Sequence, residues 1–246
     1  MCITCGDVDH RPALTRRGFM ATGGAAALGA LWSKHAAAAD PVTPGSPPPP
    51  NAISPAAALQ RLMQGNARYA ANTPNQRDFS AGRAARARGQ HPIAAILSCA
   101  DSRVAPEIVF DQDPGELFVV RVAGNVVSPD LLASLEYGVQ FLGAPLIMVL
   151  GHSGCGAVDA AIKVVQSKVQ LPGHLPDLIG AIKPAVLIAS RLAPNDVLNY
   201  GIAENVRRQV ARLDASPPIV QKLRREKKID IVGGVYDIAS GKVTAA

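Results

Sequence analysis

Three short and almost wholly apolar runs constrain the fold of this chain more than any other feature. They are "IAAILSC", "LFVVRVA" and "PLIMVLGH", at residues 93–99, 117–123 and 145–152. A strand that is buried on both faces has such a composition, whereas a half-exposed strand alternates apolar and polar residues. The runs therefore predict strands inside a parallel sheet.

Amphipathic segments lie between and around these strands. Apolar residues recur at helical spacing in six segments, at residues 54–72, 128–143, 154–166, 175–192, 195–214 and 216–228. A fourth strand and a short edge strand are expected within "IDIVGGVYDIASGKV", which contains a turn at Ser240 and Gly241. Strands that alternate with helices predict an α/β fold, with a mainly parallel central β-sheet of four to five strands flanked by helices.

The N-terminal 39 residues are typical of a secretory signal. Arg16 and Arg17 are adjacent, a short apolar run follows them, and "KHAAAAD" offers a cleavage site before Asp40. The apolar run is shorter than the ~20 residues that span a bilayer. The arginine pair predicts export by the twin-arginine translocase, and hence a location in the periplasm, the cell envelope or outside the cell.

A proline-rich segment, residues 40–52, predicts a semi-rigid linker before a single domain at residues 53–246. Four of the 25 basic and two of the 19 acidic residues precede residue 40, so the mature chain carries a net charge of +4. The basic runs "RAARARG" and "KLRREKK" lack interleaved aromatic residues, which disfavours nucleic-acid binding. No segment of the mature chain is long and apolar enough to predict a membrane span.

Cysteine usage points to a metal site. Cys2 and Cys5 lie in the predicted signal, which leaves Cys99 and Cys155 in the mature chain. Cys99 ends the first apolar run, His152 ends the third, and Cys155 begins the next helical segment. The carboxyl ends of parallel strands share one edge of a sheet, so these residues meet there if the two strands are neighbours. Two thiolates and an imidazole suit tetrahedral zinc.

Other interpretations remain open at this point. Cys99 and Cys155 are also compatible with a disulfide, which export permits, with plain buried thiols, or with a redox pair. A redox pair is usually spaced C-x-x-C, and the only such spacing here lies in the predicted signal. A non-catalytic zinc module normally has four protein ligands, and only three candidates are evident.

Two motifs that contain the candidate ligands resemble those of a known enzyme family. "SCADSRV", residues 98–104, and "GHSGCGA", residues 151–157, together resemble the signature of the β-class carbonic anhydrases. "LMQGNARY", "DPGELFVVRVAGN" and "LEYGV" are similar to further family segments, and the agreement extends from about residue 56 to residue 238. The resemblance implies a zinc enzyme that reversibly converts CO2 and water to bicarbonate and a proton by attack of zinc-bound hydroxide. It also implies a homodimer or a tetramer.

The resemblance assigns a role to each candidate residue. One Zn²⁺ per chain would be bound by Cys99, His152 and Cys155. Asp101 and Arg103 match the catalytic Asp-Arg pair of the family. The residues that match substrate-binding positions are Gln90, Gly156, Phe118 and Tyr137.

The resemblance leaves two questions open and adds one expectation. A hydrolase of carbonyl sulfide or carbon disulfide would use a similar cleft, because those substrates resemble CO2 in shape. Asp101 would close the site if it left Arg103 and became a fourth zinc ligand. Family members with an inhibitory bicarbonate pocket carry a tryptophan at the position of Ile96, so we expect this chain to lack that pocket.

Overall fold

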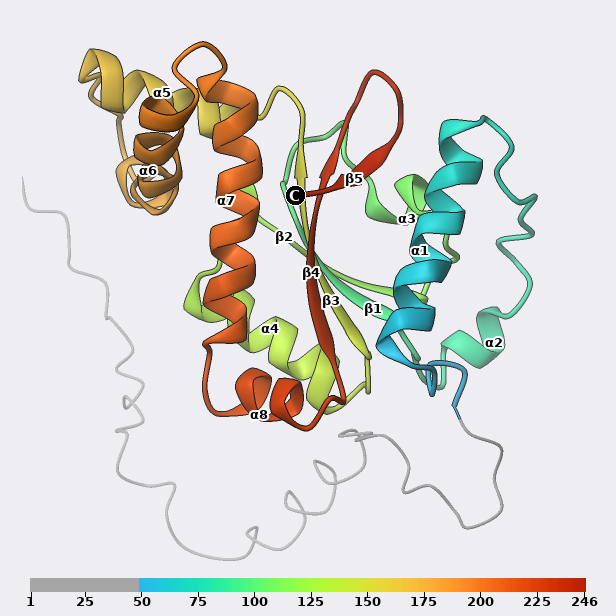
Figure 1. Cartoon of the computed structure of the whole chain (residues 1–246). Coiled ribbons are helices and arrows are strands. Elements are labelled where there is room, and N and C mark those ends of the chain that lie inside the picture. The colour runs from blue at the N-terminus through green and yellow to red at the C-terminus, as the bar shows by residue number, and fades with distance from the viewer. Residues whose placement is uncertain (1–48) are drawn as a thin grey trace, which may run out of the picture. The chain divides into compact units, whose positions relative to one another are not determined.

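A computed structural model describes residues 49–246. The predicted signal and residues 40–48 of the predicted linker lie outside the described residues. The centre is a five-stranded sheet in the order β2-β1-β3-β4-β5 (Figure 1). The strands are β1 (Ala94–Ser98), β2 (Leu117–Arg121), β3 (Leu146–His152), β4 (Asp230–Tyr236) and β5 (Val243–Ala245). Neighbouring strands from β2 to β4 pair in parallel and β5 pairs antiparallel to β4, which confirms the predicted fold class.

The two most apolar strands, β1 and β3, lie side by side in the interior of the sheet. Every residue of β1 and of β3 is buried. Ile96 pairs with Val119 on one side and with Met148 on the other, so β1 has no free edge. This position explains the lack of polar alternation, because helices cover both faces of these strands.

Helices form a layer on each side of the sheet (Figure 1). One face carries α4 (Pro129–Gln140), α7 (Val197–Asp214) and α8 (Ile219–Arg225), whose apolar residues share a core cluster with β1 and β3. The other face carries α1 (Pro55–Ala70) and α3 (Pro106–Val109), and Leu62 and Val109 belong to a second cluster there. The short helix α2 (Arg83–Arg86) has no buried residue, as expected for a solvated basic run.

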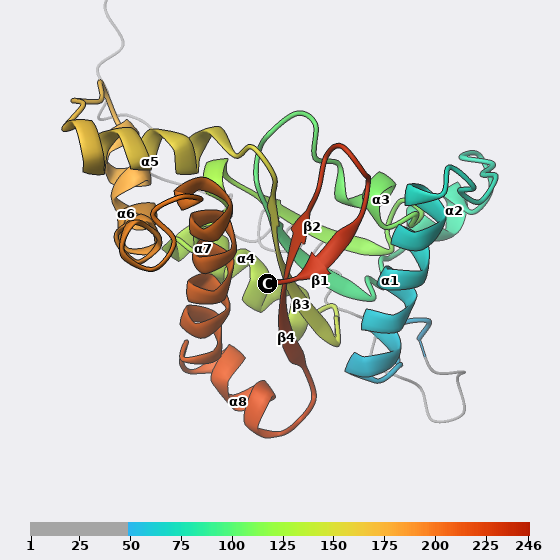
Figure 2. The ribbon, with the colours of Figure 1, turned by 45° about the horizontal axis from the view of Figure 1, so that its top comes forward.

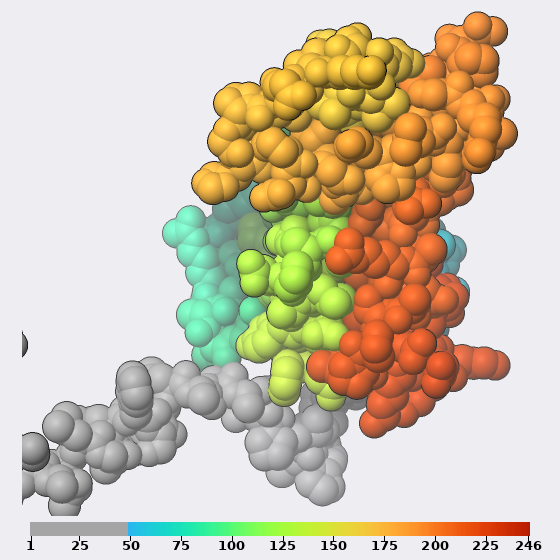
Figure 3. Space-filling view, turned by 90° about the vertical axis from the view of Figure 1, so that its left-hand side faces the viewer, coloured from blue at the N-terminus to red at the C-terminus, as the bar shows by residue number. Residues whose placement is uncertain are grey.

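A third group of helices lies beyond α7. The helices α5 (Gly156–Ser167) and α6 (Leu175–Leu192) pack on each other and on the first half of α7 (Figure 2). In the space-filling view they form the yellow and orange upper part of the molecule, above the α4 and α7 surface (Figure 3). Their apolar residues enclose a third core cluster that also contains Cys99 and Cys155.

The predicted starts of α1 and α4 coincide with the observed ones, whereas α5, α7 and α8 begin two or three residues later than predicted. Ser54 caps α1, since its hydroxyl accepts a hydrogen bond of 3.1 Å from the Ala57 N–H. Ser128 precedes Pro129 at the start of α4, although its hydroxyl makes no capping hydrogen bond to that helix. In both helices proline occupies the first turn, where a missing N–H removes no helical hydrogen bond.

The described end of the proline-rich segment contacts the domain. The Asn51 side chain is buried and donates hydrogen bonds to the carbonyls of Leu142, at 2.6 Å, and Pro92, at 3.3 Å. These bonds fix the chain before α1. Between residues 49 and 246, no helix combines the length and the apolar character that crossing a bilayer requires.

Candidate metal centre

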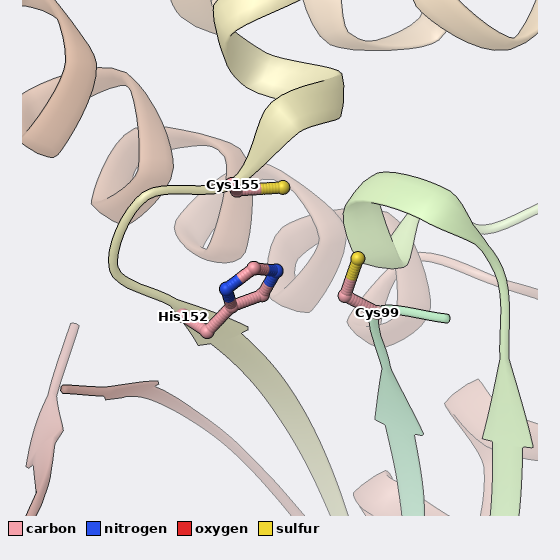
Figure 4. A group of neighbouring side chains, drawn as sticks. All are labelled: Cys99, His152 and Cys155. Carbon is pink, nitrogen blue, oxygen red and sulfur yellow. The ribbon is translucent and has the colours of Figure 1, made fainter. Parts of the chain in front are cut away.

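The structure brings the three predicted ligands together at the carboxyl edge of the sheet. Cys99 follows β1, His152 is the last residue of β3, and Cys155 precedes the first residue of α5. Their ligand atoms all lie within 4.8 Å of one another, and all three residues are buried. The side chains point toward one another from three different elements (Figure 4). β1 and β3 are neighbours in the sheet, which is the condition that this convergence required.

The histidine ring is oriented as a metal ligand. His152 Nδ1 lies 3.0 Å from the Ser153 carbonyl oxygen, which only accepts hydrogen bonds, so Nδ1 carries the proton. This leaves Nε2 buried, and it makes no hydrogen bond to any atom of residues 49–246. Ser153 is fixed in turn, because its N–H donates to the Tyr236 carbonyl at 2.9 Å. An oriented Nε2 between two thiols fits a bound zinc ion.

The pKa values of the two thiols and of the imidazole also fit a bound zinc ion. A hydrogen bond with Cys155 lowers the pKa of Cys99 to about 4, and the same bond raises the pKa of Cys155. Burial lowers the pKa of His152, but the neighbouring charge of Cys99 and the hydrogen bond to the Ser153 carbonyl outweigh it and raise that pKa. A cation that takes all three ligands therefore displaces protons from the group.

A tight turn next to Cys99 donates a hydrogen bond to its sulfur. The Gly124 N–H lies 3.2 Å from Cys99 Sγ, within the 3-10 turn η1 (Ala123–Asn125). Gly124 has a φ of +73°, and a Cβ at this position would lie 2.5 Å from Ile182 Cδ1. Only glycine meets both conditions without strain. The sequence reasoning did not identify Gly124, although a glycine just after a buried strand was an available signal.

Asp101 and Arg103 form an ion pair at the rim of the group. Arg103 donates from Nε to Asp101 Oδ1 at 2.9 Å and from Nη2 to Oδ2 at 2.7 Å. These hydrogen bonds lower the pKa of Asp101 well below its usual range, against a smaller effect of burial. Asp101 Oδ2 lies 3.8 Å from His152 Nε2. The carboxylate thus borders the ligands while remaining bound to arginine.

Arg121 was missed by the sequence reasoning. This last residue of β2 donates from Nε to the Cys99 carbonyl at 3.1 Å and from Nη2 to the Asp101 carbonyl at 2.7 Å. One guanidinium therefore bridges the residue that supplies a ligand and the residue that supplies the carboxylate. Its two acceptors are backbone atoms, which leave no pattern in the sequence.

The four predicted substrate-binding residues fall into two groups. Gly156 adjoins Cys155 at the start of α5, and apart from its chain neighbours and its own helix backbone no described atom lies within 4 Å of the place where its Cβ would be. Gln90 is exposed on the loop before β1, at the opposite end of that strand from Cys99. A five-residue strand is roughly 13 Å long, so Gln90 lies far from the ligands of its own chain.

The two aromatic candidates also lie away from the ligands. Phe118 pairs in register with Ala95, near the start of both strands. Its ring centroid is 6.2 Å from that of Tyr137, which is 5.4 Å from that of Phe141. Tyr137 and Phe141 are 46% and 57% exposed. The structure of a single chain therefore groups the aromatic residues with one another, and not with Cys99.

A parallel α/β sheet that gathers two thiols, an oriented imidazole and an arginine-bound carboxylate defines a zinc metalloenzyme of the α/β class. A family model described as carbonic anhydrase matches residues 94–243. The sequence is 39% identical over 190 residues to carbonic anhydrase 2 of Mycobacterium tuberculosis, which covers 77% of this chain and 91% of that protein. The chain belongs to the carbonic anhydrase family, in its β class.

Solved structures agree with this assignment. The β-carbonic anhydrase CcaA matches with a TM-score of 0.60 at 30% identity, over 76% of this chain and 94% of that one. One of two tetrameric β-carbonic anhydrases from Sordaria macrospora shares the fold, with a TM-score of 0.61 at 23% identity, over 77% of this chain and 96% of that one. The prediction of a zinc-dependent carbonic anhydrase is confirmed by the family and by the ligand group.

Proposed function

We propose that this chain catalyses the reversible hydration of CO2 to bicarbonate and a proton, with one zinc ion held by Cys99, His152 and Cys155. The observation that carries the proposal is the position of Asp101, whose Oδ2 lies 3.8 Å from His152 Nε2 while Arg103 holds both of its oxygens. Among residues 49–246 the group offers three Cys/His ligands, and catalytic zinc sites keep a position open in this way.

Bound zinc supplies a hydroxide nucleophile at neutral pH, because it lowers the pKa of a coordinated water from ~15.7 toward ~7. Asp101 remains a carboxylate at neutral pH because hydrogen bonds from Arg103 lower its pKa. A carboxylate only accepts hydrogen bonds, so Asp101 would accept one from the O–H of the hydroxide, whose proton stays on that oxygen. This hydrogen bond would orient the hydroxide, so that a lone pair of its oxygen would face CO2.

Backbone geometry supports the two charged side chains. Arg103 Nη2 also lies 3.4 Å from the Gly154 carbonyl, which ties the ion pair to the loop that leads to Cys155. Gly156 opens α5, where the N–H groups of the first turn attract negative charge. We place the bicarbonate product at this helix end.

The test is CO2 hydration by the full chain, followed by stopped-flow with an indicator from about pH 6.5 to pH 9, together with the zinc content. We expect Asp101→Ala to retain zinc and to lose turnover. Asp214→Ala is the matched control, since Asp214 is an exposed residue at the end of α7 that pairs with Arg224, away from the ligands. A zinc-loaded chain that does not hydrate CO2 would refute the proposal; hydrolysis of carbonyl sulfide or carbon disulfide by it would identify the alternative substrate.

We propose further that the active site is completed in a homo-oligomer. Gln90, Phe118 and Tyr137 match substrate-binding residues of the family but lie away from the ligands of their own chain. The partly exposed Tyr137 and Phe141 offer an apolar surface for a second copy, which would bring its own set to this site. The tetrameric relatives from Sordaria macrospora give a precedent for assembly.

Light scattering after gel filtration tests the assembly. Phe141→Glu is expected to give a monomer with reduced turnover, because it places a charge in the apolar surface. Phe79→Glu is the matched control, since Phe79 is 60% exposed on a different surface loop. A Phe141→Glu chain that stays oligomeric and active would contradict this part of the proposal.

We also propose export by the twin-arginine route, on the strength of Arg16, Arg17 and the small-residue stretch before Asp40. Export of a folded chain would allow zinc to be loaded in a reducing compartment. Cell fractionation should find the parent outside the cytoplasm, with a mature N-terminus near Asp40. The double variant Arg16→Lys with Arg17→Lys should remain in the cytoplasm, whereas the control Arg11→Lys should be exported like the parent. If the parent, the double variant and the control were distributed equally between the fractions, the twin-arginine route would be refuted.

A further inference from the structure

The helix α7 carries two buried polar side chains, Asn205 and Gln209. Within residues 49–246, these two side chains form hydrogen bonds only with each other and with backbone groups of the η1 turn and the residues just after it. Asn205 and Gln209 are 1% and 4% exposed, one helical turn apart. Asn205 Nδ2 donates to the Gly124 carbonyl at 2.8 Å. Gln209 Oε1 accepts from the Val127 N–H at 2.9 Å, and Gln209 Nε2 donates to Asn205 Oδ1 at 3.2 Å.

These residues occupy positions that apolar side chains would otherwise fill. Ile202, Val206 and Leu213 are the buried apolar residues of the same helix face. Burying an amide costs free energy unless its polar atoms are hydrogen-bonded. The two amides are paired with backbone groups that lie 81 and 82 positions earlier in the sequence, so they fix the η1 turn against α7.

The turn that they fix is the one that contacts the metal group. The Gly124 carbonyl accepts from Asn205, and the Gly124 N–H donates to Cys99 Sγ at 3.2 Å. A continuous path of hydrogen bonds therefore runs from Gln209 through Asn205 and Gly124 to the sulfur. In metal sites such outer contacts orient the ligands and tune the charge that they donate.

We propose that Asn205 and Gln209 are positioning residues of the metal centre, which act by holding the Gly124 N–H on the Cys99 sulfur. With that hydrogen bond in place the thiolate is fixed in direction and part of its charge is withdrawn from the metal. Without it the sulfur is free to move and donates more charge. The inference rests on the proposed zinc chemistry, but it concerns the binding of the metal and not the turnover of CO2.

The experiment compares near-isosteric variants of buried amides. Asn205→Leu removes the bond to Gly124, and Gln209→Met removes the bond to Val127 while keeping the length of the side chain. Asn66→Leu is the matched control. Asn66 is 4% exposed on α1 and makes three hydrogen bonds, to Val109, Gly241 and Val243, on the other face of the sheet.

Two measurements on the full chain distinguish positioning from general stability. Competition with a chromophoric chelator gives the zinc affinity, and the Co²⁺-loaded chain gives the sulfur-to-metal charge-transfer band. We expect Asn205→Leu to weaken zinc binding by about 10-fold or more and to move the band to longer wavelength. Gln209→Met should produce a smaller change in the same direction. Asn66→Leu should lower the melting temperature and leave both readings at the parent values.

Zinc affinities and cobalt spectra that match the control would overturn the proposal. If Asn205→Leu and Gln209→Met bind zinc within about twofold of the Asn66→Leu control, and their cobalt spectra match the parent, the amides serve only the core. If Asn205→Leu does not fold, Gln209→Met alone decides by the same two readings. A chain that binds zinc normally but does not hydrate CO2 would refute the proposed function and leave this test unaffected.

Discussion

Arg121 provides the most direct test of how this site is assembled. Its guanidinium bridges the carbonyls of Cys99 and Asp101, at 3.1 Å and 2.7 Å. Replacement by methionine keeps an unbranched side chain and removes both hydrogen bonds. The side chain is exposed, so each bond is assigned the low value of ~1 kcal/mol, which gives ~2 kcal/mol in all. At ~1.4 kcal/mol for each tenfold change, Arg121→Met should lower kcat/KM roughly 30-fold.

Stopped-flow CO2 hydration with zinc-saturated protein measures this loss directly. Arg121→Lys should recover only part of it, because an ammonium group lacks the fork that reaches two carbonyls at once. Arg207→Met is the matched control, since Arg207 pairs with Glu204 on α7 and contacts none of the ligands. If Arg121→Met retains kcat/KM within twofold of Arg207→Met, the bridge does not position the loop, and the reasoning from its geometry is refuted.

Three further predictions follow from the same region. Gly124→Ala should lower the free energy of unfolding, measured by urea denaturation, by about 2 kcal/mol or more, because Gly124 has a positive φ and an added Cβ would meet Ile182. Adding Ile182→Val removes the contacting methyl group and should restore part of this stability. A Gly124→Ala chain as stable as the parent would contradict the prediction. The pKa of Asp101 is lowered on folding, so the stability that the ion pair contributes should be constant above about pH 4 and be lost as the pH falls below it; acid unfolding of Asp101→Asn against the parent checks this. Zinc affinity should weaken as the pH falls from about 8 to about 6, because protons compete for His152, whose pKa is raised, and for the thiols; a pH-independent dissociation constant in chelator competition would count against the ligand set.

The central sheet could be predicted from the sequence because burial on both faces leaves an unambiguous composition. β1 and β3 are buried at every residue, and an uninterrupted apolar run of this length is typical of such strands. The meeting of Cys99 with His152 could be predicted only on the condition that β1 and β3 are neighbours, since the carboxyl ends of adjacent parallel strands coincide. The short helix α3 was not predicted, because four residues carry too little periodicity.

The supporting residues of the site were beyond the sequence reasoning for a different reason. Arg121 and Asn205 bind backbone carbonyls that lie 22 and 81 positions away, and a carbonyl has no residue identity to recognise. One signal was available for Asn205 and Gln209. They share the apolar face of α7 with Ile202 and Val206, and a polar pair on such a face has to find partners in the core.

The separation of the ligands along the chain gives the metal a second physical effect. Cys99 and His152 lie 53 positions apart, and the segment between them contains β2, η1 and α4. A cross-link that closes a loop of this length restricts the unfolded chain by about 4 kcal/mol in the chain-entropy estimate used for disulfides. An unfolded chain that bound zinc with these residues would have to close the same loop at that cost, so the ion prefers the folded chain, in which the ligands already lie together. Zinc therefore stabilises the folded state by binding to it, and cells that are short of zinc would lose folded protein as well as activity.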